Sequence, residues 1–195
     1  MCWLSVSAAK PKATTARVFF ALWPPTAVAE ALADYAAQAA GQFGGRATRQ
    51  QTIHLTLAFL GTLAIDRLPA LCAAAASVQA PSVTLTIDQA NYWPHNQLLW
   101  AGSRDTEPAL MQLVDQLHGA LRDAGFSLAN GTRKFVPHVS LVRKMPEPVA
   151  AANLSPIPPL IWPNHRFILV ASTLSPNGPD YRQLAEFPCF SQAPR

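Results

Sequence analysis

The fold of this chain is decided by a short stretch in which polar and apolar residues alternate, TIHLTLAFLG at residues 52–61. Alternation with a period of two is typical of a β-strand that buries one face and exposes the other. A second stretch with the same alternation, VPHVSLVR, occupies residues 136–143. Both stretches contain the pattern His-x-Thr/Ser-Leu, so the sequence predicts the same kind of strand twice.

Each motif places an imidazole and a hydroxyl on one face of its strand, because residues i and i+2 of a strand point the same way. His54 therefore lies beside Thr56, and His138 lies beside Ser140, while the apolar residues between them face a core. Such a pair on a rigid element suits a catalytic group. An ordinary solvated strand face gives the same pattern, and the spacing alone leaves both interpretations open.

Two opposed histidines suit the cleavage of a phosphodiester. In-line attack on phosphorus needs a base beside the nucleophile and an acid beside the leaving group, and histidine, with a pKa of about 6.5, can act as either. The hydroxyls could donate hydrogen bonds to phosphate oxygens, and Arg143, three residues beyond Ser140, adds a guanidinium. This chemistry requires no metal. A zinc site is the weaker interpretation, because no carboxylate or cysteine stands at ligand spacing beside either motif histidine.

Composition places the chain among soluble globular proteins. Half of its 195 residues are hydrophobic and 13% are charged, which excludes disorder of the whole chain. No apolar run approaches the roughly 20 residues of a membrane span. Three cysteines without a CxxC pair favour a reducing cytoplasm. The net charge of +4 fits either an ordinary surface or a shallow attraction for polyanions such as RNA.

The order of predicted elements favours an α+β fold with mainly antiparallel sheets. No glycine-rich phosphate loop follows a predicted strand, which argues against a mononucleotide-binding P-loop. We expect a flexible N-terminal arm over residues 1–16, one domain over 17–190 and a tail over 191–195. The patterns predict helices over 26–40, 66–78 and 107–124, and strands over 17–22, 52–60, 83–90, 98–101, 137–142, 166–174 and 181–186.

The two motifs together resemble the signatures of the two-histidine phosphoesterase superfamily. The stretches HLTLAFLG (54–61) and PHVSLVR (137–143) carry the likeness, and RVFFAL (17–22) resembles that family's opening strand. The likeness covers roughly residues 16–190 and is closest to the bacterial and archaeal RNA 2′,3′-cyclic phosphodiesterases, formerly called 2′-5′ RNA ligases. It implies two pseudo-symmetric lobes, each an antiparallel sheet with outer helices, and a catalytic cleft between them lined by the motif strands.

The resemblance also implies a role for each motif residue. His54 would be the proton donor to the departing 3′ oxygen, and His138 the proton acceptor that activates water. Thr56, Ser140 and Arg143 would bind the phosphate. Ser140 replaces the commoner threonine and keeps its hydroxyl. We expect a 2′-phosphate product, no metal and no cofactor.

RNA ends or nucleotide 2′,3′-cyclic phosphates are the expected partners of a monomeric protein that does not bind membranes. Whether the chain also carries out the reverse 2′-5′ ligation stays open. Two alternatives are a phosphodiesterase for a small cyclic phosphate derived from a nucleotide or ADP-ribose, and a non-catalytic protein that binds RNA ends.

Several other residues are interpreted as structural. His118 is expected on a helix surface, and His95 and His165 carry no motif. A second group is more typical of a core than of a stacking platform, although one of its members, or Tyr181, could stack on a nucleobase: Phe59, Trp93, Trp100 and Phe135. The basic residues near the motifs are expected to be solvated, with contact to an RNA backbone as the alternative: Arg46, Arg49, Arg133 and Lys134.

Overall fold

The computed structural model describes residues 14–129, 131, 134–146, 153–176 and 178–190. The helices are α1 (Thr26–Phe43), α2 (Leu68–Ala76) and α3 (Pro108–Asp123), with short 3₁₀ helices η1 (Gln50–Thr52), η2 (Ile65–Arg67) and η3 (Pro94–Asn96). The strands are β1 (Thr15–Leu22), β2 (Arg46–Ala47), β3 (Leu55–Ala64), β4 (Val83–Ile87), β5 (Gln89–Trp93), β6 (Leu98–Gly102), β7 (Val139–Arg143), β8 (Leu160–Asn164), β9 (Arg166–Ser175) and β10 (Gly178–Pro188).

The strands of the described residues form one eight-stranded sheet, and β4 pairs with β8 in a small second sheet. The order in the large sheet is β10-β9-β1-β3-β7-β6-β5, with β2 paired to β7, and these pairings are antiparallel. Strands β3 and β7 are paired through Leu55 and Val139. The large sheet therefore consists of two halves that meet at one residue pair.

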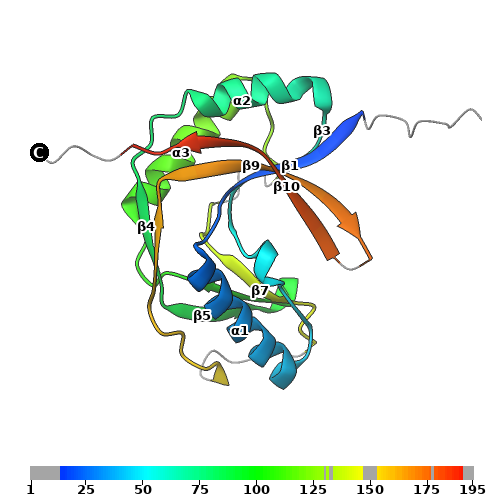
Figure 1. Ribbon diagram of the computed structural model, residues 1–195, viewed down its shortest axis with the longest axis vertical. Helices are drawn as coiled ribbons and strands as arrows, with labels where there is room; N and C mark the ends of the chain where they lie inside the picture. The colour runs from blue at the N-terminus through cyan, green and yellow to red at the C-terminus, as the bar shows by residue number, and fades with distance from the viewer. Residues whose placement is uncertain (1–13, 130, 132–133, 147–152, 177, 191–195) are drawn as a thin grey trace, which may run out of the picture.

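The two halves repeat the same unit, in which a strand, a helix and a motif strand follow one another. The units are β1–α1–β3 and β6–α3–β7. The helices cross between them, since α1 packs against β7 and α3 packs against β3. In Figure 1, α2 and α3 lie at the upper end with β9 and β10, and α1 lies at the lower end with β5 and β7. The expected α+β fold with antiparallel sheets is confirmed.

Strand β1 serves two apolar clusters because its side chains alternate between the two faces of the sheet. Phe20 and Leu22 enter the main core beneath the helices. Phe19 and Ala21 face the other way, into a small cluster with Ile168 and part of β10. Each fully buried large apolar side chain contributes about 1.5–3 kcal/mol to stability. The second cluster is the one that lies on the side of the functional site.

The first and last residues of the helices are set by local chemistry, which the apolar pattern predicted only in part. Helix α1 begins directly after Pro25, as expected, but continues through Gly41 to Phe43. It ends where Gly44 adopts a φ of 79° and its N–H bonds the carbonyl of Ala40, a backbone conformation that favours glycine. Helix α3 is capped by Glu107, whose side chain accepts a hydrogen bond from the backbone N–H of Ala109 at 3.2 Å.

Three strand predictions need correction. Strand β3 begins at Leu55 rather than Thr52, because Gln50–Thr52 form η1, and it continues past Gly61 to Ala64. The strand predicted over 83–90 is divided at Asp88 between the two sheets as β4 and β5. Strand β8 was missed, because its central Trp162-Pro163 is atypical of a strand and follows a proline-rich segment.

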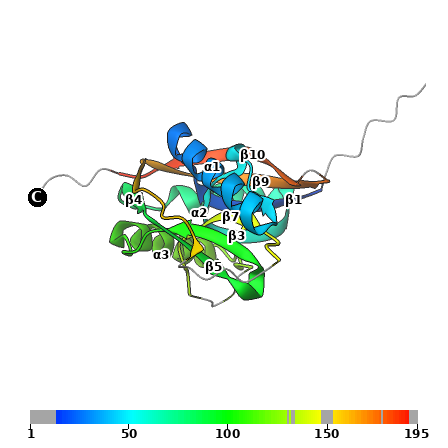
Figure 2. The ribbon, with the colours of Figure 1, turned by 90° about the horizontal axis from the view of Figure 1, so that it is seen from below.

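The chain ends lie mostly outside the described residues. This applies to most of the N-terminal arm expected over 1–16 and to the tail expected over 191–195; β1 already begins at Thr15. Within the described part of the chain, no helix has the length and apolar character needed to cross a membrane. Seen from below in Figure 2, as in Figure 1, the end of β9 and the start of β10 lie across the molecule from β4.

Candidate active site

The junction of β3 and β7 brings the four motif side chains together. When the antiparallel register Leu55↔Val139 is extended by one residue on each side, His54 lies opposite Ser140 and Thr56 lies opposite His138. Directly opposed residues have Cβ atoms about 4.5–5.5 Å apart, and diagonal neighbours about 7–8 Å apart. The two imidazoles therefore lie on the diagonal of a small rectangle, with a hydroxyl beside each.

The leucine after each hydroxyl residue is the extra residue of a β-bulge. On β3, Ala21 pairs with Thr56 and Phe20 with Ala58, so that Leu57 has no partner. On β7, Ser140 pairs with Trp100 and Val142 with Leu99, so that Leu141 has none.

A bulge shifts the alternation of the following residues by one position. It turns Arg143 to the face of Ser140, and its guanidinium Nη2 donates a 2.9 Å hydrogen bond to the Ser140 Oγ. On β3, the equivalent position after the bulge is Phe59. The repeated His-x-Thr/Ser-Leu pattern thus encodes a repeated bulge.

The imidazole of each motif is fixed by the chain that precedes it. His54 Nδ1 lies 2.7 Å from the carbonyl oxygen of Thr52, and His138 Nδ1 lies 2.8 Å from that of Val136. A carbonyl oxygen only accepts, so Nδ1 carries the hydrogen in both rings. Nε2 is the atom left for chemistry, and in His54 it lies 3.1 Å from the Thr56 Oγ1.

Burial favours the neutral form of both histidines in the free protein. Burial lowers the pKa of His54 to about 4; the hydrogen bond to Thr52 opposes this shift, and the charges of Arg143 and His138 add to it. Burial also lowers the pKa of His138, against its bond to Val136 and together with Arg143. An anion bound at the rectangle would oppose the lowering of these pKa values by the neighbouring positive charges.

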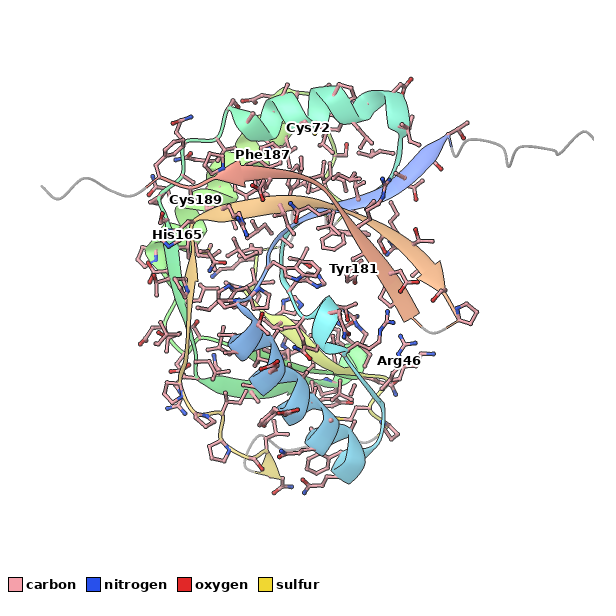
Figure 3. The ribbon with its side chains drawn as sticks, in the orientation of Figure 1. Arg46, Cys72, His165, Tyr181, Phe187 and Cys189 are labelled. Carbon is pink, nitrogen blue, oxygen red and sulfur yellow. The ribbon has the colours of Figure 1, made fainter. Side chains whose placement is uncertain are left out.

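Two cavities open at opposite ends of the rectangle and share Ser140 and Arg143 as a common wall. The first, which we call the arginine cavity, has a volume of about 130 Å³. Figure 3 shows Tyr181 on its upper side and Arg46 on its lower side. It is lined by Arg46, Ala47, Thr48, Arg49, Thr52, His54, Ser140, Arg143, Gly178, Pro179 and Tyr181.

The second, which we call the aromatic cavity, has a volume of about 580 Å³ and lies on the side of His138. Its walls combine flat rings with a few cationic and polar groups. The rings come from Phe59, Trp93, Trp100 and Phe135, with Lys134, His95 and His118 beside them.

The arginine cavity is strongly cationic. Arg46 and Arg143 are direct partners in the β2–β7 pairing. Like charges in such positions repel one another and destabilise a sheet. Arg49 is held by the carbonyl oxygen of Pro179 at 2.6 Å and by the Asp180 carboxylate at 3.1 Å. Asp180 does not line the cavity, whose described lining contains no carboxylate. The arrangement is suited to bind an anion.

Sequence reasoning favoured other roles for several residues of this site. The rings of Phe59, Trp93, Trp100 and Phe135 line the aromatic cavity, where core positions were favoured and stacking on a base by one of them was the alternative; of these only Trp100 is buried. His118 lies on α3 and is partly exposed, as expected; its hydrogen-bond partner was not predicted, since its Nε2 lies 2.9 Å from the carbonyl oxygen of Leu57 on β3. The pattern gave no signal for these positions, because the crossing of α3 to β3 is a tertiary feature. Arg133 lies outside the described residues.

Comparison with known proteins places this geometry in a family. Residues 22–100 match the model of the family described as LigT like Phosphoesterase. An RNA 2′,3′-cyclic phosphodiesterase of Escherichia coli strain K12 is 33% identical over 133 residues, which cover 68% of this chain and 74% of the relative. The chain belongs to the LigT-like phosphoesterase family.

Other members of the LigT-like family extend the match along the chain. An RNA 2′,3′-cyclic phosphodiesterase of Thermus thermophilus is 28% identical over 185 residues, covering 88% of this chain and 89% of the relative. The crystal structure of E. coli LigT complexed with 3′-AMP superposes with a TM-score of 0.79 at 29% identity, covering 90% of this chain and 98% of that one. The family expected from the two motifs is therefore confirmed.

Anion binding to this LigT-like site is expected to take up a proton. A bound dianion raises the lowered pKa of His54, so the affinity for the anion increases as the pH falls below that raised pKa toward the free value of about 4, by up to about tenfold per unit. Sulfate is the suitable probe, because its charge is constant in this range. Calorimetric titration measures the slope. His54→Gln should flatten it, and an unchanged slope in that variant would assign the proton to another group.

Proposed function

We propose that the protein hydrolyses RNA 2′,3′-cyclic phosphate ends to 2′-phosphates by acid–base catalysis with two histidines and no metal. The proposal is carried by the diagonal placement of His54 and His138 around a cationic cavity. It is supported by membership in a family whose relatives include proteins named RNA 2′,3′-cyclic phosphodiesterase.

The chemistry starts with His138. Its Nε2 takes a proton from water, because Nδ1–H is already donated to the Val136 carbonyl oxygen. The water attacks phosphorus in line with the bond to the 3′ oxygen. His54 Nε2, protonated once the phosphate is bound, gives its proton to that oxygen as the bond breaks. The 2′ oxygen keeps the phosphate.

The hydroxyl and guanidinium groups stabilise the charge that develops on the phosphate oxygens. Thr56 and Ser140 stand beside the two imidazoles, and Arg143 reaches the same place because of the bulge at Leu141. Charged donors fixed in advance stabilise a transition state most effectively, since they need no reorganisation. Arg46 and Arg49 extend the positive surface toward an RNA backbone.

The aromatic cavity binds RNA bases. Unpaired RNA bases stack on aromatic side chains, and a volume of about 580 Å³ falls within the range typical of ligand sites. We infer a monomer as the catalytic unit, since one chain carries every residue assigned to the reaction. The described thiols, Cys72 and Cys189, are free, in keeping with a reducing cytoplasm.

Incubation with a nucleoside 2′,3′-cyclic phosphate, followed by phosphorus NMR, tests the function. The resonance of a 2′-phosphate should replace that of the cyclic ester, and His138→Ala should slow the conversion severely. Comparison with an RNA oligonucleotide that ends in the same group should show a higher kcat/KM for the RNA. A preference for the small cyclic phosphate would favour a nucleotide phosphodiesterase. Binding without turnover would leave an RNA-end binding protein.

Chelation should not affect the activity. In the described part of the chain, no group of three or more histidine, cysteine, aspartate or glutamate residues is placed to hold a metal ion. The acid, the base and the charge stabilisation all come from side chains. The measurement is kcat/KM before and after dialysis against EDTA. Loss of turnover that zinc or magnesium restores would replace this mechanism with a metal-assisted one.

A further inference from the structure

The ring of His54 lies in a box of aromatic side chains. When the register Leu22↔Leu55 is extended by one residue, Trp23 becomes the direct neighbour of His54. The two rings are stacked, with centroids 5.4 Å apart and planes 10° from parallel. Phe19 lies at 4.9 Å and Tyr181 meets the imidazole by an edge at 5.3 Å.

The second motif histidine has a different aromatic neighbour. The rings of Trp93 and His138 are 4.7 Å apart but inclined at 67°, so they meet edge to face. The first histidine has an indole stacked face to face against it, and the second does not. This asymmetry is independent of the motif sequences, which are alike.

The charges around His54 make its protonated form costly. It faces Arg143 on β7 and His138 just before β7, both of which oppose a positive charge on the imidazole. Tyr181 faces it from β10, and Arg46 and Arg49 line the same cavity. The hydrogen bond to the Thr52 carbonyl oxygen favours the cation. An acid at this position needs further stabilisation.

We propose that Trp23 is a positioning residue that stabilises the protonated form of His54 by a cation–π contact and keeps its Nε2 directed at the phosphate. The proposal rests on the proposed function, in which His54 is the acid. A cation within about 6 Å of an aromatic centroid, over the face of the ring, is attracted by the quadrupole, and tryptophan gives the strongest attraction. The stacked geometry of Trp23 meets these conditions.

The same indole could instead act only by excluding water. Exclusion of water disfavours the charged imidazole, whereas a cation–π contact favours it. The two effects predict opposite results when the ring is removed. Trp23→Leu keeps an apolar side chain and removes the π face, and Trp23→Phe keeps a face with a weaker quadrupole.

NMR titration of the His54 ring in saturating sulfate distinguishes the cation–π contact from the exclusion of water. Trp23→Leu should lower the pKa of His54 by about one unit, and Trp23→Phe should lower it by less. Trp93→Leu is the matched control, because Trp93 contacts His138, and it should leave the His54 titration in place. A pKa that rises or stays unchanged in Trp23→Leu overturns the proposal. Should that variant fail to fold, Trp23→Phe provides the same test of sign.

Kinetics provides a second readout. Trp23→Leu should lose about tenfold in kcat/KM on a cyclic phosphate, whose alkoxide leaving group needs an acid. Its kcat/KM on a nitrophenyl phosphodiester should be unchanged, because the nitrophenolate leaves without an acid. Equal losses on both substrates overturn the proposal. Full activity of His54→Ala on the cyclic phosphate would instead refute the proposed function, whatever the titration of the Trp23 variants shows.

Discussion

His138→Ala and His54→Ala should each lower kcat/KM for a 2′,3′-cyclic phosphate by about 10²–10⁴-fold, the usual contribution of one general acid or base. The first change removes the base and the second removes the acid, each anchored through Nδ1 to a backbone carbonyl oxygen. Because both act in one transition state, the double variant should lose less than the product of the two losses. Steady-state kinetics of the three variants measures this.

The direction of proton transfer is tested with an activated leaving group. A nitrophenyl phosphodiester should restore the rate of His54→Ala and leave His138→Ala impaired. The opposite pattern would exchange the two roles. His165→Ala is a matched control, since His165 is exposed and bonds Ser82 at 3.3 Å, away from the cavities. It should retain full activity. If neither motif variant loses activity, the site is elsewhere.

Ser140→Ala and Thr56→Ala should each lower kcat by about 10²–10³-fold, as expected for one donor to a developing negative charge. Ser140 also holds the guanidinium of Arg143. Ser140→Ala and Arg143→Met should therefore be non-additive in a double-mutant cycle. Thr56 and Arg143 share no recorded hydrogen bond, so that pair should show a smaller coupling.

Thr62→Ala provides the control for these losses. Thr62 lies on the same strand as Thr56 but is exposed and outside both cavities. Its replacement should leave kcat unchanged. Additive losses for Ser140 and Arg143 would mean that the two side chains act separately on the phosphate, and a loss below tenfold for Ser140→Ala would remove its hydroxyl from the phosphate site.

The polar half of the site was predictable because its pattern is local. A period of two places His54 with Thr56 and His138 with Ser140 on one face, whatever the rest of the fold does. Arg143 was proposed as a phosphate ligand from its place three residues beyond Ser140 and from family resemblance, although regular alternation would have turned it away from Ser140. The bulge that brings it back depends on the pairing of two strands and cannot be derived from spacing.

The aromatic half was not predictable for a related reason. In β1 both faces are apolar, because one face enters the main core and the other forms the cluster around His54. The apolar run of β1 therefore does not indicate that Trp23, which follows it, faces the site. The division of residues 83–90 between two sheets likewise follows from where β8 and β6 lie, which the alternation of these residues does not reveal.

Each repeat depends on the helix of the other for its core, because α1 packs against β7 and α3 packs against β3. A gene fragment that ended near β6 would encode α1 without the strand β7 that it covers, and β3 without α3. The apolar face of a helix or strand that lacks its partner has nothing to pack against. A half taken from another protein would therefore have to supply matching contacts for both α1 and α3, even though the two halves look alike. The cleft residues are not bound by this packing, and the equivalent positions after the two bulges hold residues as different as Phe59 and Arg143.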